Sequence, residues 1–218
     1  MPVRRLDILI PAGEVSLEGT LTLPENASGV VAFAHGSGSS RHSPRNRYVA
    51  EVLHEHGIAT LLFDLLTVRE DQTYATRFDI GLLTERLLAA IGWLEENKET
   101  KGMKIGCFGA STGAAAALQA AAKHPAIAAV VSRGGRPDLA GPQALASVRS
   151  PTLLIVGGWD DGVIELNQQA YELLRCEKKL EIVPGATHLF EEPGTLEQAA
   201  EHAARWFRSQ LAPRNHWR

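Results

Sequence analysis

A serine inside a G-x-S-x-G pentapeptide is the first feature of the sequence that suggests chemistry. Residues 107–113 read CFGASTG, and Gly109, Ser111 and Gly113 form the pentapeptide. A chain of this length and composition matches such a pattern by chance roughly once in ten cases, so the motif needs support from its surroundings. A nucleophilic serine of this kind lies on a tight turn between a strand and a helix. The stretches KIGCF before it and AAAALQAAAKH after it predict both elements.

A serine nucleophile needs a general base, and three histidines follow Ser111 in the chain: His188, His202 and His216. His202 lies within the last predicted helix and His216 lies in the C-terminal tail. His188 follows the predicted strand KLEIVPGAT and therefore falls on a loop at the carboxyl end of a strand. We expect His188 to be the base.

The base in turn needs an acid that orients it, and Asp160 and Asp161 directly follow the predicted strand PTLLIVGG. A turn over residues 160–162 would by itself explain both aspartates. The order Ser, Asp, His along the chain favours a catalytic role, because it is the order of α/β-hydrolases. We favour Asp160, which leaves the strand first, and keep Asp161 as the alternative.

The loop His35-Gly36-Ser37-Gly38 is expected to help bind the oxyanion of the reaction. One of the two amides required is that of Thr112, the residue after the nucleophile, and the other is assigned to Ser37. His35 and Gly36 are candidate substrate-binding residues because they begin the same loop. The loop has no Walker A lysine and no G-x-G-x-x-G, so a nucleotide is not expected there.

Further substrate-binding candidates follow other predicted strands. Trp159 and Leu189 flank the proposed acid and base and are candidate walls of the pocket. Arg133 or Arg136 could bind a substrate carboxylate, although an ion pair with Asp138 or another acid is the preferred explanation for them. The residues Arg41, His42 and Arg45 either meet an acidic substrate or form a solvated helix start.

The elements that must position these residues alternate along the chain. RLDILIP and VSLEGTLTLP predict an antiparallel pair of strands at a sheet edge. After them, continuous apolar strands alternate with helices, such as those expected after Ser43 and over residues 79–97. Residues 195–198 match a capping box at the start of the last helix. This alternation predicts a mostly parallel sheet with helices on both faces and functional loops at the carboxyl ends of the strands.

With AHGSGSS, GASTG, VGGWDDGV and GATHLF in this order, the sequence resembles the α/β-hydrolase superfamily, and within it the dienelactone hydrolase-like family. The resemblance implies a triad of Ser111, Asp160 and His188 that hydrolyses a carboxylic ester or related acyl compound without metal or cofactor. Dienelactone hydrolases proper carry a cysteine where this chain has Ser111, which favours simple esters. The segment 134–150 is too short for a large lid domain, so we expect one domain over residues 1–218 and small or short-acyl substrates.

Several alternatives remain open at this stage. A thioesterase, a lactonase or a peptidase would use the same three residues, and a hydrolase-fold binding protein would not turn over a substrate at all. The presence of a complete triad argues against the last.

The composition narrows the classes of partner. The net charge is −3, and 44% of the residues are hydrophobic. No long block of one charge suggests nucleic acid or a membrane surface, and no apolar run is long enough for a transmembrane helix. The two cysteines do not make a disulfide framework. We expect a cytoplasmic protein that acts on a small-molecule ester; a homodimer is compatible with this interpretation.

Overall fold

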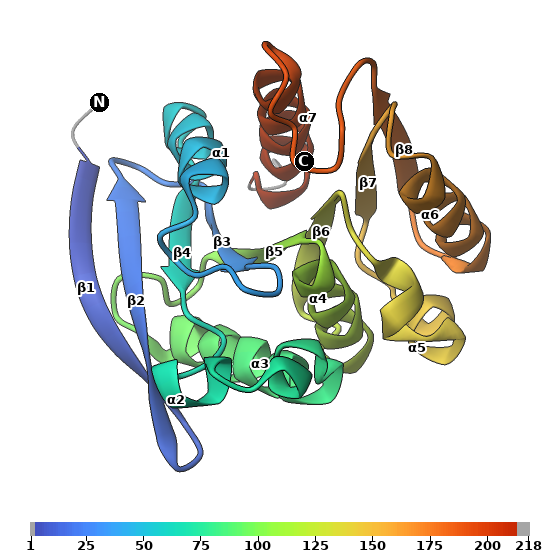
Figure 1. Ribbon diagram of the computed structural model, residues 1–218. Helices are drawn as coiled ribbons and strands as arrows, with labels where there is room; N and C mark the ends of the chain where they lie inside the picture. Colours follow the sequence, from blue (N-terminus) through green and yellow to red (C-terminus); the bar gives the residue numbers. More distant parts are fainter. Residues whose placement is uncertain (1–2, 213–218) are drawn as a thin grey trace.

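Eight strands form one sheet in the computed structural model, which describes residues 3–212 (Figure 1). In the order in which they lie side by side, the strands are β1 (Val3–Ala12), β2 (Val15–Pro24), β4 (Ala59–Phe63), β3 (Gly29–Ala34), β5 (Lys104–Ala110), β6 (Ile127–Arg133), β7 (Thr152–Gly157) and β8 (Lys178–Val183). The β1–β2 and β2–β4 pairs are antiparallel and all the others are parallel. The predicted N-terminal edge pair and the predicted α/β-hydrolase fold are thereby confirmed.

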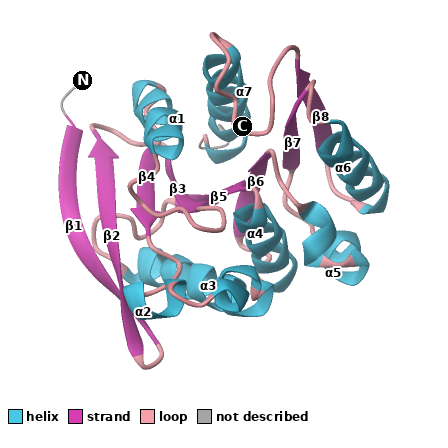
Figure 2. Ribbon diagram, in the orientation of Figure 1, coloured by secondary structure: helices cyan, strands magenta, loops and turns pink. Residues whose placement is uncertain are grey.

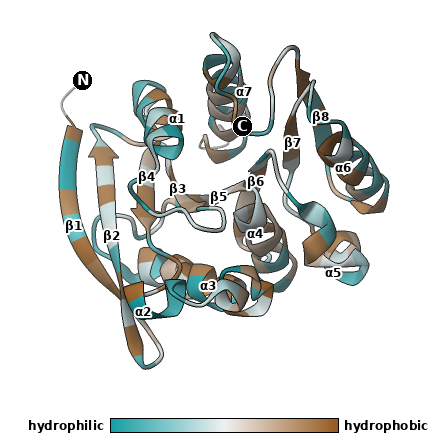
Figure 3. Ribbon diagram, in the orientation of Figure 1, coloured by the Kyte–Doolittle hydropathy of each residue, from teal (hydrophilic) through white to brown (hydrophobic). Residues whose placement is uncertain are grey.

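Helices cover both faces of this sheet (Figure 2). One face is covered by α1 (Pro44–Glu55) and α7 (Thr195–Leu211), which also contact each other. The other face carries α3 (Ile80–Glu96), α4 (Thr112–Lys123), α5 (Pro142–Ser147) and α6 (Asp161–Leu173). Hydrophobic and hydrophilic residues are mixed along the outer helices, as in α6 in Figure 3, because only one side of such a helix meets the sheet.

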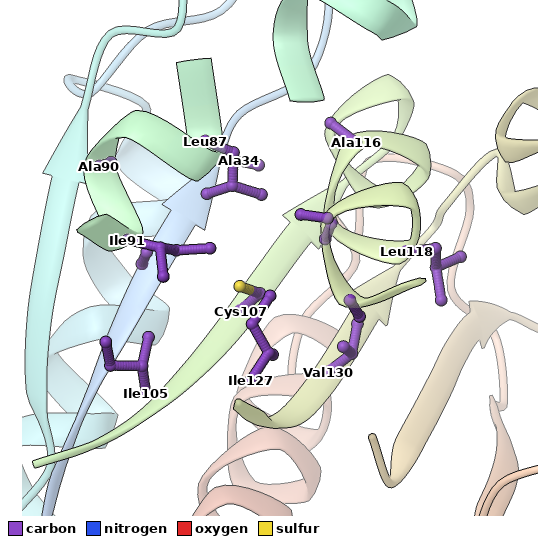
Figure 4. Close-up of a cluster of buried hydrophobic side chains, with 14 of the residues drawn as sticks. Ala34, Leu87, Ala90, Ile91, Ile105, Cys107, Ala116, Leu118, Ile127 and Val130 are labelled. Carbon is purple, nitrogen blue, oxygen red and sulfur yellow. The ribbon is translucent and has the colours of Figure 1, made fainter. Parts of the chain in front are cut away.

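The central strands are buried on both faces, so their side chains alternate between two hydrophobic clusters. In β3, Val30 and Ala32 belong to the cluster under α3 and α4, whereas Val31 and Phe33 belong to the cluster under α1 and α7. This period of two is the geometry of a strand. Figure 4 shows part of the first cluster, including Cys107. Cys107 is fully buried in this core, and burial raises the pKa of its thiol to about 12.

Two connections matter for the site. Between β4 and α3 the chain forms a short helix, α2 (Val68–Asp71), and a 3-10 turn, η1 (Tyr74–Phe78), which the sequence reading did not identify. Between β6 and β7 lie only the turn η2 (Pro137–Ala140) and the six-residue α5. The second connection agrees with the expectation that no large lid domain is present.

The predicted capping box at Thr195 is wrong. Gly194 occupies the N-cap position with a left-handed backbone (φ 80°), and Thr195 is already the first residue of α7. The Thr195 hydroxyl therefore donates to the carbonyl of Glu192 at 2.7 Å. A capping box does occur at α2, where Thr67 and Glu70 each accept from the backbone of the other.

Among residues 3–212, no helix is long and apolar enough to cross a membrane. Within the same range, no group of three or more histidine, cysteine or acidic side chains could hold a metal ion.

His54 links the fold to pH. This α1 residue is 9% exposed, and its Nε2 lies 2.7 Å from the Thr60 hydroxyl of β4. Burial, reinforced by the charge of Arg5, lowers the pKa of His54 from 6.5 to about 4. Between these two pH values His54 is protonated in the unfolded chain and neutral in the folded chain. The free energy of unfolding therefore decreases as pH falls from about 6.5 towards 4.

We predict that His54→Gln reduces this pH dependence of the unfolding free energy, which for one such group amounts to up to about 3 kcal/mol. Denaturant unfolding of both proteins at several pH values between 4 and 7 measures the difference. Equal slopes for the wild type and the variant would contradict the assignment to His54.

Candidate active site

Ser111 lies on a strained turn between β5 and α4. Its backbone has φ 51° and ψ −120°, a region that residues other than glycine rarely adopt. Strain of this kind costs about 1–3 kcal/mol and persists where the surrounding structure enforces it. The Ser111 carbonyl accepts from the amides of Ala114 and Arg136, each at 3.1 Å. The turn is therefore held from both the helix and the loop after β6.

The glycines on either side explain the pentapeptide. A Cβ at Gly113 would lie 2.1 Å from the carbonyl oxygen of Ala34, and one at Gly109 would lie 2.4 Å from the Cα of Ala114. Both distances are far below any real contact of a Cβ atom. The glycines thus permit α4 to approach the ends of β3 and β5.

His188 and Asp160 meet across the loops that follow β8 and β7. The Nδ1–H of His188 donates to Oδ2 of Asp160 at 2.7 Å. Because the carboxylate can only accept, Nδ1 carries the proton and Nε2 of a neutral ring is free to accept another. Asp160 occupies the N-cap position of α6 without making a capping bond, and Asp161 is the first residue of the helix. The structure therefore brings Asp160, rather than Asp161, to His188.

A pocket of about 260 Å³ joins these loops. Ser111 and His188 both line it, together with Gly36, Ser37, Arg133 and Leu189 of the predicted site. Its remaining lining residues are Ser39, Ser43, Arg45, Asn46, Ala110 and Gly134. The predicted nucleophile and base thus share one pocket with several of the residues expected to bind substrate.

The two residues assigned to the oxyanion site also lie together, but with a contact that the sequence reading did not foresee. The Ser37 amide donates to the side-chain hydroxyl of Thr112 at 2.9 Å. The Ser37 amide, which the sequence analysis assigned to the oxyanion, therefore already has an acceptor in this structure. The Thr112 amide lies at the first position of α4, where no carbonyl of the helix can accept from it.

His35 and Trp159 were predicted to bind substrate, and neither is among the residues that line this pocket. His35 is 7% exposed; its Nε2 accepts from the Leu65 amide at 3.0 Å, and its Nδ1 therefore donates to the Gly36 carbonyl at 3.0 Å. Burial lowers the pKa of His35, which favours this neutral ring. Through these two hydrogen bonds the His35 ring connects the loop after β3 to the segment after β4. Trp159 is 69% exposed and lies on the surface.

The two arginines after β6 differ from each other. Arg136 pairs with Asp138 through two hydrogen bonds of 2.9 and 2.7 Å, as expected. Arg133 does not share this partner. It is 7% exposed, and its guanidinium lies over the rings of Phe108 and Phe190 at 5.7 and 5.9 Å. The preferred explanation of an ion pair with Asp138 thus holds for Arg136 and fails for Arg133.

The remaining candidates differ in their positions. Arg45 lines the pocket, whereas Arg41 does not and instead pairs with Asp64 and with Glu18. His202 lies within α7, 3.8 Å from Glu181, and His216 lies outside the described residues.

The family model and the solved structures that match this chain point to the same family. Residues 17–212 match the model of the dienelactone hydrolase family. A dienelactone hydrolase from Anabaena variabilis is 56% identical, and the superposition covers 96% of this chain and 99% of that chain with a TM-score of 0.93. An esterase from Pyrococcus furiosus shares the fold at 20% identity, covering 96% and 92% of the two chains with a TM-score of 0.79.

Two Mycobacterium tuberculosis proteins that carry the provisional name phosphoribosyl transferase are 58% identical over 211 residues. The match covers 96% of this chain and 47% of each of theirs, so the chain spans about half the length of these curated relatives.

We predict that Gly113→Ala disrupts the site, because its Cβ would collide with the Ala34 carbonyl. The added strain should cost on the order of 1–3 kcal/mol or more of unfolding free energy. Gly92→Ala is the matched control, since Gly92 also lies in a helix and has nothing within 4 Å of the added Cβ. It should be neutral or stabilise by about 0.4–1 kcal/mol. Chemical denaturation compares the two; equal stability of both variants would refute the argument.

Proposed function

Because the chain belongs to the dienelactone hydrolase family, we propose that it is a serine hydrolase of small or short-acyl carboxylic esters. The observation that carries the proposal is the 2.7 Å hydrogen bond between Asp160 and His188 beside a strained Ser111 in one pocket. The family supports hydrolase chemistry in general. The ester substrate and the three catalytic assignments are the parts that we add.

The first half of the reaction forms an acyl-enzyme. Nε2 of His188 accepts the hydroxyl proton of Ser111 while Oγ of Ser111 forms a bond to the ester carbonyl carbon. The carbonyl oxygen becomes an oxyanion. When the tetrahedral intermediate collapses, the bond to the leaving alkoxide breaks, and the alkoxide takes the proton from His188. Asp160 stabilises the positive imidazolium that exists between these two proton transfers.

The second half replaces the alcohol by water. His188 removes a proton from water, the hydroxide attacks the acyl carbon, and collapse of the second intermediate returns the proton to Ser111. The products are a carboxylic acid and an alcohol. No additional reactant is needed besides water.

The oxyanion is expected to bind the amides of Thr112 and Ser37. The Ser37 amide already donates to the Thr112 hydroxyl, which aligns the loop with α4 before substrate arrives. The oxyanion would share or replace that acceptor. Preorganised donors of this kind are effective because they need little reorientation as the charge develops.

A small substrate is supported by the connections around the pocket. The pocket volume is about 260 Å³, and only η2 and α5 lie between β6 and β7. A long acyl chain gains about 0.8 kcal/mol for each buried CH₂ only where an apolar surface can receive it. Apart from Leu189, the side chains lining this pocket are mostly small or polar.

The transferase name of the mycobacterial relatives applies to proteins about twice as long. This chain itself has the family and fold of a hydrolase. We therefore assign the hydrolase site to this chain, and the activity of the remaining half of those relatives plays no part in the proposal.

We predict that Ser111→Ala abolishes ester hydrolysis, with kcat reduced on the order of 10⁴- to 10⁶-fold, because the nucleophile is removed. Asp160→Asn should impair turnover far more than Asp161→Asn, since only Asp160 contacts His188. The assay is hydrolysis of p-nitrophenyl butyrate, with folding checked by circular dichroism.

A serine-directed phosphonate probe separates this proposal from a binding protein without turnover. It should label the wild type at Ser111 and leave Ser111→Ala unlabelled. Near-normal turnover in folded Ser111→Ala would refute the triad, and the reverse ranking of the two aspartate variants would refute the choice of acid.

Substrate size gives a further prediction. Acetyl and butyryl p-nitrophenyl esters should exceed the palmitoyl ester in kcat/KM because the pocket offers little apolar surface. A chain-length series below the micelle threshold measures this. A steady rise towards long chains would instead indicate a lipase-like groove.

A further inference from the structure

β1 is an edge strand of the sheet, and its outer edge has no partner among the described strands (Figure 1). It spans ten residues, whereas β8 at the opposite edge spans six. A long edge strand presents a row of backbone amides and carbonyls that can pair with another chain. The outer edge of β1 is therefore a candidate interaction surface.

The two faces of β1 differ in character. Its apolar even-numbered side chains belong to the hydrophobic cluster under α3 and α4. Its odd-numbered side chains lie on the opposite face, where Val3 is 41% exposed and Leu9 is 64% exposed. Between them on the same face lie Arg5 and Asp7, which are also exposed. This face therefore carries the order apolar, positive, negative, apolar.

The hairpin geometry determines which backbone groups of β1 face its free edge. Ala12 and Val15 close a two-residue turn whose first residue, Gly13, has φ 65°. The residues that close such a turn exchange both hydrogen bonds, and the bonding then alternates along an antiparallel pair. The even-numbered residues of β1 thus bond to β2, and the backbone groups of the odd-numbered residues face outward. Pro11, which has no amide to donate, lies at an outward position.

Two copies of β1 match each other in one antiparallel register. When Leu6 lies opposite Leu6 of the second copy, Arg5 lies opposite Asp7, and Val3 lies opposite Leu9. Each of these two pairs occurs twice because of the two-fold symmetry. The residues of all four pairs face outward, so each pair would exchange two hydrogen bonds. The exposed face would then hold two ion pairs between two apolar pairs.

The neighbouring registers are unfavourable. Sliding one copy by two residues is the smallest shift that keeps outward groups opposite outward groups. In one direction this shift places Arg5 opposite its own copy, and in the other direction it places Asp7 opposite its own copy. Like charges directly opposite each other destabilise a strand pair. The order of charges on β1 therefore favours self-pairing in the single register centred on Leu6.

We propose that a second copy of this chain pairs with the outer edge of β1, so that two sheets join into one continuous sheet about a two-fold axis at Leu6. A strand pair covers less than the about 1,600 Å² of a standard interface, so we expect a dimer with a Kd in the micromolar range. The inference goes beyond the proposed function and does not depend on it. β1 contributes no residue to the pocket of Ser111, and the pairing leaves that pocket unchanged.

Protection of the edge is the competing explanation for the charges of β1. Charged side chains on an edge strand can prevent pairing with any other chain. Asp7 also has a partner within its own chain, because the hydroxyl of Thr20 in β2 donates to its Oδ1 at 3.1 Å. Protective charges would keep the chain monomeric. Charges that select a second copy would instead make association depend on how the signs are matched.

Exchange of the two charges separates these explanations. Arg5→Asp gives each strand two aspartates and Asp7→Arg gives each strand two arginines, so each variant should raise the Kd of the dimer about 10-fold or more. The double variant, Arg5→Asp with Asp7→Arg, should dimerise like the wild type because each pair keeps opposite charges. An equimolar mixture of the two single variants should form a heterodimer for the same reason. Sedimentation velocity at neutral pH over about 1–300 µM measures all four cases.

Two further variants test the backbone pairing and the total charge. Leu9→Pro removes an outward amide and keeps the hydrogen bonds to β2, so it should abolish the dimer while circular dichroism stays unchanged. Glu14→Arg is the matched control for Asp7→Arg. It changes the net charge equally but lies in the exposed turn outside the paired residues, so the Kd should remain the same.

Amide hydrogen exchange gives an independent measurement. The amides of Arg5, Asp7 and Leu9 should exchange more slowly as the protein concentration rises, and that of Glu14 should not change. A wild type that sediments as a monomer over the whole range would overturn the proposal. A dimer that neither single variant weakens, or a weakened dimer that neither the mixture nor the double variant restores, would overturn it as well.

Discussion

The close approach of α4 to the ends of β3 and β5 is the constraint on which the rest of the site depends. Gly113 brings the helix against the carbonyl of Ala34, at a distance where no other residue fits. This contact fixes the start of α4 relative to the loop after β3. It thereby places Ser111 on its strained turn and sets the Ser37 amide against the Thr112 hydroxyl. Both amides of the candidate oxyanion site are therefore positioned by backbone packing.

The polar and charged groups around the pocket are each held by specific neighbours. His35 is kept neutral by burial and by two backbone partners, so it anchors the loop without adding a charge. Asp160 leaves the N-cap position of α6 unbonded and directs its carboxylate to His188 instead. Arg133 remains charged between two aromatic rings. The candidate base His188 and the guanidinium of Arg133 thus line the same pocket.

The sequence predicted the parts of the fold and site that follow from local pattern. Apolar runs and turn residues located the strands, and the ends of those strands located Ser111, His188 and Asp160, because parallel strands deliver their loops to one edge of a sheet. Contacts between distant segments could not be obtained in this way. The difference between Arg133 and Arg136 depends on which guanidinium reaches Asp138, and the bond from Ser37 to Thr112 joins loops 75 positions apart.

The orientation of the His35 ring and the start of α7 were not predicted from the sequence for the same reason. His35 lies within a glycine-rich loop, and only the tertiary contact with the Leu65 amide shows that its ring turns inward. Residues 195–198 match a capping box in letters, but the left-handed Gly194 starts α7 one residue earlier than the pattern implies. In each case a backbone geometry that residue types do not encode decided the outcome.

The position of β8 at the edge of the sheet makes the site unequal in its resistance to local unfolding. Ser111 follows β5, which has a strand on each side, whereas His188 follows β8, which among the described strands pairs only with β7. Edge elements with few partners open at lower free energy than the centre of a fold. The loop that carries His188 can therefore detach in partial openings that leave β5 and its turn intact. The lifetime of the assembled site is thus set by the edge of the sheet, while the persistence of the fold is set by its centre.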